Sequence, residues 1–390
     1  MRKVYMDHAA GMPINPRVFE AMKPYFTQNY GNPSSSHSFA ASAKNALMES
    51  RKKVAQLIGA EKPEEVIFTS GGTESNNLAL KGAAYRNKKK GNHIITTTIE
   101  HISTINICKH LQKQGFEVTY MPVDKQGMVY PQKLEDAITD KTILISVMYA
   151  NGEIGTIQPI KKIGKIAHEN QIHFHVDAVA AAGKIPINVV EENIDLLSIS
   201  SNDIYGPKGM GALYIKKGTR IQPVSQGGGQ EKGLRSGTEN IPGIVGIGKA
   251  AEIAQEEIIA EGKRLSQLRD KLVKNVLNTI ERSHLNGHPT KRLPNNANLR
   301  FSYIEGEALI LGLDMLGIQV SSGSACTSKT LEPSHVLLAI GLAHEDAHGS
   351  LVFTMGKQNS EEDVDYVLEV LPSVVKRLRA MSPLTPKEIR

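Results

Sequence analysis

Short apolar runs alternate with longer segments of helical spacing along the first two thirds of the chain. The short runs are rich in Ile and Val, as is typical of buried strands. Between them, segments such as 159–170 repeat apolar residues at the helical period. This alternation predicts βαβ units, and therefore an α/β fold whose mostly parallel sheet carries helices on both faces. The predicted strands are 65–69, 93–97, 117–122, 142–149, 173–176, 195–199 and 212–215.

The last third of the chain begins with a long predicted helix, 242–274, in which charged residues flank an apolar stripe. We expect this helix to lead from a large domain into a smaller α+β domain. Residues 1–14 are predicted to pack with the small domain, 15–260 to form the large domain, and 261–390 to form the small one. The remaining predicted elements are a strand at 297–302 and helices at 306–316 and 361–381.

Composition places the chain among ordinary globular proteins, because 40% of its 390 residues are hydrophobic and 22% are charged. The net charge of +6 is mild and spread along the chain, so nucleic-acid binding is not expected. The sequence begins without a signal-peptide pattern and has no membrane-length apolar run. Two cysteines cannot build a disulfide framework, which favours a cytoplasmic location.

The loop Thr-Ser-Gly-Gly-Thr-Glu-Ser-Asn-Asn at 69–77 is the first candidate binding element. It follows a predicted strand and opens a predicted helix, so its backbone N–H groups and the helix N-terminus could hold an anion. Many tight turns share this composition, and the loop alone does not identify a ligand.

Two further segments give a more specific signal. The stretch 197–214 contains Asn202, Asp203 and the run Gly-Pro-Lys-Gly at 206–209, and residues 321–328 read Ser-Ser-Gly-Ser-Ala-Cys-Thr-Ser. Together with the 69–77 loop, they resemble the NifS/IscS cysteine desulfurases, which are pyridoxal-phosphate (PLP) enzymes. The resemblance extends over nearly the whole chain. It implies the type I PLP-dependent transferase fold, also called the aspartate aminotransferase-like fold.

The resemblance also assigns positions to a cofactor site. His101 matches the histidine that stacks on the pyridine ring, and Asp177 matches the carboxylate that keeps the pyridine nitrogen protonated. Thr238 lies in a segment that reaches the phosphate of the partner subunit in the family, which implies a homodimer. The positions assigned to the cofactor are Gly72, Thr73, His101, Asp177, Ser200 and Thr238.

Five positions depart from the family pattern. Asp203 stands where the family has the lysine that forms the Schiff base with PLP, and Asn202 replaces the histidine before it. Gly152 and Ala180 replace an asparagine and a glutamine of the cofactor pocket. Val352 replaces the arginine that binds the carboxylate of substrate cysteine, so the charge-assisted hydrogen bonds of that arginine are lost.

These departures leave two interpretations. In the first, they are neutral differences in an active PLP-dependent cysteine desulfurase, which makes L-alanine and a persulfide from L-cysteine with an unusual base. Lys208 or another amine would then substitute for the missing lysine. In the second, the protein no longer needs to turn over cysteine, and the residues required for that reaction have been lost. We favour the second, in which PLP, if present, binds weakly and non-covalently.

Cys326 is retained in the loop whose cysteine carries the persulfide in IscS-type enzymes. A thiolate is also a natural ligand of iron–sulfur clusters. Cys326 could therefore ligate a [2Fe-2S] cluster shared with a U-type scaffold protein, or relay sulfur to it. The C-terminal segment 372–390 matches the region that docks this scaffold. Cys108, in contrast, is expected to be a buried small hydrophobic residue.

A third interpretation is that the protein takes part in RNA thiolation. It rests on the functions known for the resembled family and on a pI near 9.0.

Overall fold

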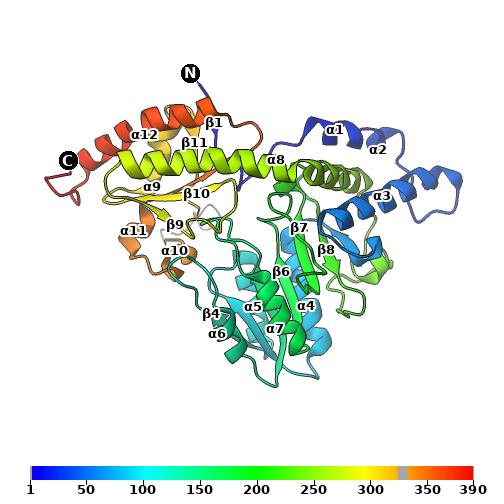
Figure 1. Ribbon diagram of the computed structural model, residues 1–390. Coiled ribbons are helices and arrows are strands. Elements are labelled where there is room, and N and C mark those ends of the chain that lie inside the picture. The colour runs from blue at the N-terminus through cyan, green and yellow to red at the C-terminus, as the bar shows by residue number, and fades with distance from the viewer. Residues whose placement is uncertain (1, 324–332, 390) are drawn as a thin grey trace.

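A seven-stranded sheet forms the centre of the structure, a computed structural model that describes residues 2–323 and 333–389 (Figure 1). Six of its strands run in the same direction, whereas β8 runs opposite to them and pairs antiparallel with both of its neighbours. The predicted mostly parallel sheet is therefore confirmed. In spatial order the strands are β2 (Val66–Thr69), β8 (Gly211–Ile215), β7 (Leu196–Ser200), β6 (His173–Asp177), β5 (Thr142–Met148), β3 (His93–Thr97) and β4 (Glu117–Met121).

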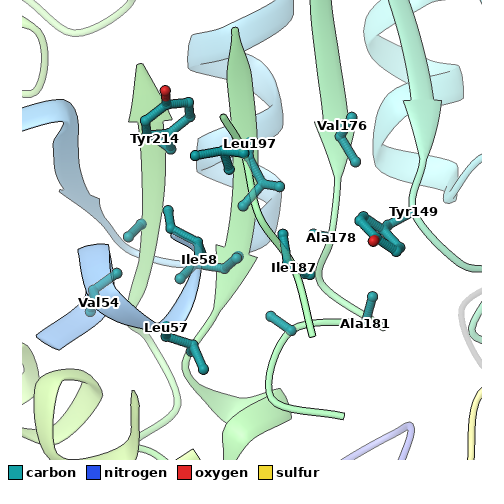
Figure 2. Close-up of a cluster of buried hydrophobic side chains, with 14 of the residues drawn as sticks. Val54, Leu57, Ile58, Tyr149, Val176, Ala178, Ala181, Ile187, Leu197 and Tyr214 are labelled. Atoms are coloured by element: carbon teal, nitrogen blue, oxygen red, sulfur yellow. The ribbon is translucent and has the colours of Figure 1, made fainter. Parts of the chain in front are cut away.

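Two apolar cores cover the two faces of this sheet, because neighbouring residues of a strand point to opposite sides. Ile94 packs in a core with α4 (Gly72–Asn87) and α5 (Ile102–Lys113). Ile95 belongs to the other core, which contains α3 (Ala41–Leu57), α7 (Ile160–Glu169) and the first half of α8 (Ile241–Thr279). Figure 2 shows part of this second core, which contains Val54 and Leu57 of α3 together with Leu197 and Tyr214 of the sheet. Short helices at the rim are α1 (Pro16–Met22), α2 (Pro24–Thr27) and α6 (Pro131–Asp136).

The C-terminal third builds a second, smaller sheet. Strand β10 (Asn296–Phe301) pairs antiparallel with β9 (Ser283–Asn286) and β12 (Ser350–Thr354). The N-terminal strand β1 (Val4–Tyr5) pairs in parallel with β11 (Ile318–Gln319) in a separate two-stranded sheet. Val4 and Met6 are buried in the same core as β10 and β12, so the start of the chain lies with this part. The helices of this part are α9 (Gly306–Asp314), α10 (His335–Ala339), α11 (His344–His348) and α12 (Glu361–Met381).

Helix α8 joins the two parts, as Figure 1 shows. Its residue Ile247 is buried in the core of the large sheet, whereas Leu272 is buried in the core of the small sheet. The helix is longer than the predicted 242–274 because it continues through Val276, which is also fully buried. We retain the division near residue 260 as a proposal. Among the described residues, no helix has both the length and the apolar character needed to cross a bilayer.

The sheet also fixes where a ligand can bind. The C-terminal ends of β3, β5, β6 and β7 all reach the same edge, since these strands are parallel. The direction of strand addition reverses at β3, because β4 lies on one side of it and β5 on the other. In open α/β sheets, ligands bind outside the strand ends at such a reversal.

Candidate functional site

A cavity of about 290 Å³ lies at this edge of the sheet. It is formed by the loops that follow β3, β5, β6 and β7, the start of α4, and residues near β10 and β12. Six positions that the sequence assigned to the site line it together, although up to 131 residues separate them in the chain. These six residues are Gly72, Thr73, His101, Asp177, Ser200 and Asp203.

The first turn of α4 presents backbone N–H groups to the cavity. Gly71 precedes the helix with φ 149° and ψ −179°, a conformation that a residue with a side chain rarely adopts. Gly72 is equally constrained, because a Cβ atom there would lie 2.5 Å from the Val179 Cγ2 methyl group. The glycines thus keep the helix N-terminus open toward the cavity, where an anion such as a phosphate group is favoured.

Asp177 ends strand β6 and is held in one orientation. Its Oδ2 atom accepts a hydrogen bond from Asn76 Nδ2 at 2.7 Å, and its Oδ1 atom accepts one from the Val179 N–H group at 3.1 Å. The side chain is almost fully buried, with 5% exposed. A carboxylate fixed in this way can pair with a protonated ring nitrogen of a ligand.

His101 lies just before α5 and caps it. Its Nδ1 atom accepts a hydrogen bond from the Ser103 N–H group at 3.2 Å and lies 2.8 Å from Ser103 Oγ. Because Nδ1 acts as an acceptor, a neutral imidazole would carry its proton on Nε2. The cap fixes the ring at the cavity wall, where it can contact a planar ligand.

Asp203 lies in the cavity wall opposite a lysine that the sequence analysis missed. Lys184 lines the same cavity, and its Nζ atom donates a hydrogen bond to the Ala180 carbonyl at 3.1 Å. Burial lowers the pKa of Lys184, while the charge of Asp203 opposes that shift. Burial raises the pKa of Asp203, opposed by Lys184 and by a hydrogen bond from Ser200. No sequence motif marks Lys184, since its partner is brought to it only by the fold.

The lysine proposed as a substitute, Lys208, does not line the cavity. Its Nζ atom donates a hydrogen bond to the Met12 carbonyl at 3.1 Å, and its side chain is exposed. Lys184 is the one lysine among the described residues that line the cavity.

Two of the other departures meet inside the cavity. A Cβ atom added to Gly152 would lie 3.6 Å from the Ala180 Cβ atom, so the two small residues border the same space. Larger polar side chains at these positions would fill this space, which is open here. Asn202 instead serves a structural role, because its Oδ1 atom accepts a hydrogen bond from the Met12 N–H group at 3.3 Å.

The fifth departure, Val352, lines a neighbouring cavity of about 210 Å³. It lies in β12 with 2% of its surface exposed, and its N–H group donates to the Ser321 carbonyl at 2.6 Å. The buried valine presents methyl groups and no hydrogen-bond donor to this cavity. Glu153, a second residue that the sequence analysis missed, lies beside it.

The remaining predicted positions lie elsewhere. Thr238 is exposed and does not line the cavity in the single chain, so its role toward a partner subunit stays a prediction. The segment that contains Thr238 contacts the 69–77 loop of its own chain, because Arg235 Nε donates to Glu74 Oε1 at 3.1 Å. Cys326 lies outside the described residues. Cys108 is fully buried, and burial raises the pKa of its thiol to about 12, which confirms it as a packing residue.

The residues that are present fit PLP in all but one respect. The open N-terminus of α4 fits its phosphate, His101 borders the space for its ring, and Asp177 is buried and oriented for its ring nitrogen. Asp203 offers a carboxylate where a covalent bond to the PLP aldehyde would need an amine. The site therefore fits PLP, apart from the missing amine at position 203.

Comparisons with known proteins agree with this geometry. The family model for aminotransferase class-V matches residues 4–367. A protein of Methanosarcina thermophila named cysteine desulfurase IscS is 57% identical over 389 residues, which cover 100% of this chain and 96% of the relative. Cysteine desulfurase IscS 1 of Archaeoglobus fulgidus is 58% identical over 97% of this chain and 99% of its own length. A solved structure titled NifS-like protein superimposes with a TM-score of 0.91 at 39% identity, covering 97% of this chain and 100% of that chain.

Proposed function

The chain belongs to the aminotransferase class-V family, and from this premise we propose that it is an IscS-type protein of iron–sulfur cluster assembly that no longer carries out ordinary PLP-dependent desulfuration of cysteine. In this proposal it works in the cytoplasm as a homodimer and binds a U-type scaffold protein. The names of its relatives support the desulfurase lineage. The departures in the site support the loss of ordinary activity.

One observation carries the proposal, namely the carboxylate of Asp203 in the cavity wall opposite Lys184. A carboxylate cannot form a Schiff base with the PLP aldehyde, and its charge opposes the burial-driven fall in the pKa of Lys184. Val352 adds a second defect, because it offers no donor to a substrate carboxylate. Either change alone would weaken turnover of cysteine, and both together remove the groups that bind the cofactor covalently and orient the substrate.

PLP remains compatible with the site as a weakly bound, non-covalent ligand. Gly72 and Thr73 would hold its phosphate, while His101 and Asp177 would orient its ring. When bound, PLP supplies an electron-withdrawing ring that stabilises negative charge on a substrate carbon. The protein groups around it fix the ring, but Asp203 leaves it without a covalent link.

Cys326 would act in cluster assembly, either as a ligand of a shared [2Fe-2S] cluster or as a sulfur relay. Within residues 2–323 and 333–389, no three His, Cys, Asp or Glu side chains gather as metal ligands, and the proposal assigns the other cluster ligands to the scaffold. The exposed side chains of Met381 and Leu384, in the segment assigned to scaffold docking, offer an apolar contact surface. The exposure of Thr238 is consistent with its reaching a partner subunit.

A second candidate function is an active cysteine desulfurase with an unusual base. Lys184 favours it, because it is an amine within the cavity and burial lowers its pKa, which increases the neutral and nucleophilic fraction. Two features oppose this activity. The charge of Asp203 favours the charged form of Lys184, and no arginine replaces Val352 to bind the carboxylate of the substrate.

Mass mapping of PLP adducts separates the two candidates. After incubation with PLP, borohydride reduction and dialysis, we expect no adduct at Lys184 beyond that found at exposed lysines. A stable adduct mapped to Lys184 would favour the active enzyme. The proposed function would then lose its main support.

A further inference from the structure

The second cavity, of about 210 Å³, opens beside the cofactor-type cavity. The two cavities share Ala9, His101, Met148 and Gly152 in their walls. A small molecule in the second cavity would therefore lie next to any ring bound in the first. Val352 lines only the second cavity, at the position where the family binds a substrate carboxylate.

The charged groups around the second cavity are mostly acidic. Asp7 from the N-terminal segment, Glu100 from the loop after β3 and Glu153 from the loop after β5 line it. None of its described lining residues is an arginine or a lysine. His101 and His335 are its only bases within that set, and burial lowers the pKa of His335, which favours the neutral imidazole at pH 7.

Two carboxyl oxygens at this cavity are buried without a hydrogen-bond partner, Glu100 Oε2 and Glu153 Oε1. Glu100 is fully buried, and its other oxygen accepts hydrogen bonds from Thr97 and from the Met148 N–H group. The second oxygen of Glu153 accepts a hydrogen bond from Ser334 Oγ at 2.8 Å. Native proteins leave few buried polar atoms unpaired, so such atoms beside a cavity point to a ligand that donates hydrogen bonds.

Glu153 and Val352 border the same small volume. A Cβ atom added to Gly323 would lie 2.9 Å from Glu153 Cδ and also 2.9 Å from Val352 Cγ2. An arginine in place of Val352 could reach the Glu153 carboxyl group and neutralise it. The valine leaves that carboxyl group without a cation and lines the volume with methyl groups.

We propose that this second cavity binds a small primary amine that carries no carboxylate, such as an aminothiol. The ammonium group would donate hydrogen bonds to Glu153 and Glu100, while its short alkyl part would pack on Val352. Burial raises the pKa of Glu153 to about 7, so an adjacent ammonium group would readily favour its ionised form. A ligand carboxylate would meet acidic groups and no arginine. This inference rests on the proposed function, because it assigns a different ligand class to the site that no longer serves cysteine.

The test compares three thiols of similar length by isothermal titration calorimetry with the dialysed full chain at pH 7.5. Cysteamine carries only the amine, 3-mercaptopropionate only the carboxylate, and L-cysteine both. We expect cysteamine to bind at least tenfold more tightly than the other two. If L-cysteine binds as tightly as cysteamine, or if cysteamine does not bind, the inference is wrong.

Two variants and a control make the test specific. Glu153→Gln should weaken cysteamine binding at least tenfold, and Val352→Arg should reverse the preference toward L-cysteine. Glu169→Gln, at an exposed position of α7, should change neither affinity. Tight binding of L-cysteine without sulfide release would overturn this inference and leave the proposed function intact. Sulfide release over many turnovers would overturn the proposed function itself.

Discussion

Lys184 and Asp203 face the same cavity from two loops, and each charge shifts the pKa of the other toward the ionised state. A lysine at position 203, as the family pattern has it, would place two amines in this wall of the cavity. The aspartate instead makes the wall nearly neutral in charge. The change at position 203 is therefore more than the loss of one amine, because the new carboxylate also favours the charged form of the remaining amine, Lys184.

Replacing Asp203 by lysine should restore covalent attachment of PLP. The new ammonium group would lie near Lys184, and repulsion between the two lowers the pKa of both, so that a larger fraction of the amines is neutral and able to react. We expect Asp203→Lys to retain PLP after borohydride reduction and dialysis, seen as a mass adduct on residue 203. Desulfurase activity should recover only in part, because Val352 is unchanged.

Asp203→Asn is the matched control for this variant, since it removes the carboxylate without adding an amine at position 203. It should show no adduct on that residue. An Asp203→Lys protein that remains free of adduct would show that the phosphate loop, His101 and Asp177 do not suffice to position PLP.

Replacing Lys184 should measure how much its electrostatic interaction with Asp203 contributes to the free energy of unfolding. Lys184→Met leaves the half-buried carboxyl group of Asp203 without a nearby cation, so we expect a loss of about 1–3 kcal/mol in the free energy of unfolding at pH 7. A double-mutant cycle with Asp203→Asn should give a coupling energy of roughly 0.5–3 kcal/mol, measured by urea denaturation. Lys208→Met, at the exposed lysine, is the control and should stay within about 0.5 kcal/mol of wild type. Additive effects of the two cavity variants would show that Lys184 and Asp203 do not interact.

The acidic cavity predicts a pH-dependent stability. Burial raises the pKa of Glu153 from 4.5 to about 7, so the folded state keeps a proton that the unfolded state loses between these values. Stability contributed by this group therefore falls as the pH rises from 4.5 to 7. The glutamine side chain of Glu153→Gln cannot ionise. Its free energy of unfolding relative to wild type should therefore increase by about 1–3 kcal/mol from pH 5 to pH 8. Thermal or urea unfolding at the two pH values gives this difference, and a constant difference would contradict the prediction.

The sequence predicted the central elements because their signals are local. Strand β3 was predicted with its observed bounds, and α12 likewise, since one is a continuous apolar run and the other has a regular helical stripe. Strand β12 was not predicted. Its pairing with β10 is a tertiary contact that leaves no periodic pattern in the chain.

The same distinction applies to the site. The positions that match family motifs, such as His101 and Asp177, were found from the sequence and lie together in the cavity. Lys184 and Glu153 were not predicted, because the role of each depends on a residue distant in sequence that folding places beside it. Lys184 is separated from Asp203 by a strand and its flanking loops, and Glu153 meets Val352 only through the packing of the small sheet onto the large one.

A variant of Cys326 should separate docking from cluster ligation. If Cys326 is a cluster ligand, Cys326→Ala should leave the dimer and its binding to the scaffold intact, while the cluster of the complex decays faster in air or chelator. The reason is that a water or an exchangeable ligand replaces a thiolate. The decay of visible absorbance in the co-purified complex measures this. Cys108→Ala should match wild type, because Cys108 is buried in the large-sheet core. Equal decay in all three proteins would leave sulfur relay as the role of Cys326.

The most direct test of the proposed function is the release of sulfide from L-cysteine by the purified protein with added PLP and a thiol reductant. The carboxylate at position 203 and the valine at position 352 predict a rate no greater than that of free PLP under the same conditions. The rate should not saturate with cysteine, since the site lacks the groups that would bind it for turnover. Many turnovers per protein chain with a saturable dependence on cysteine would contradict the account.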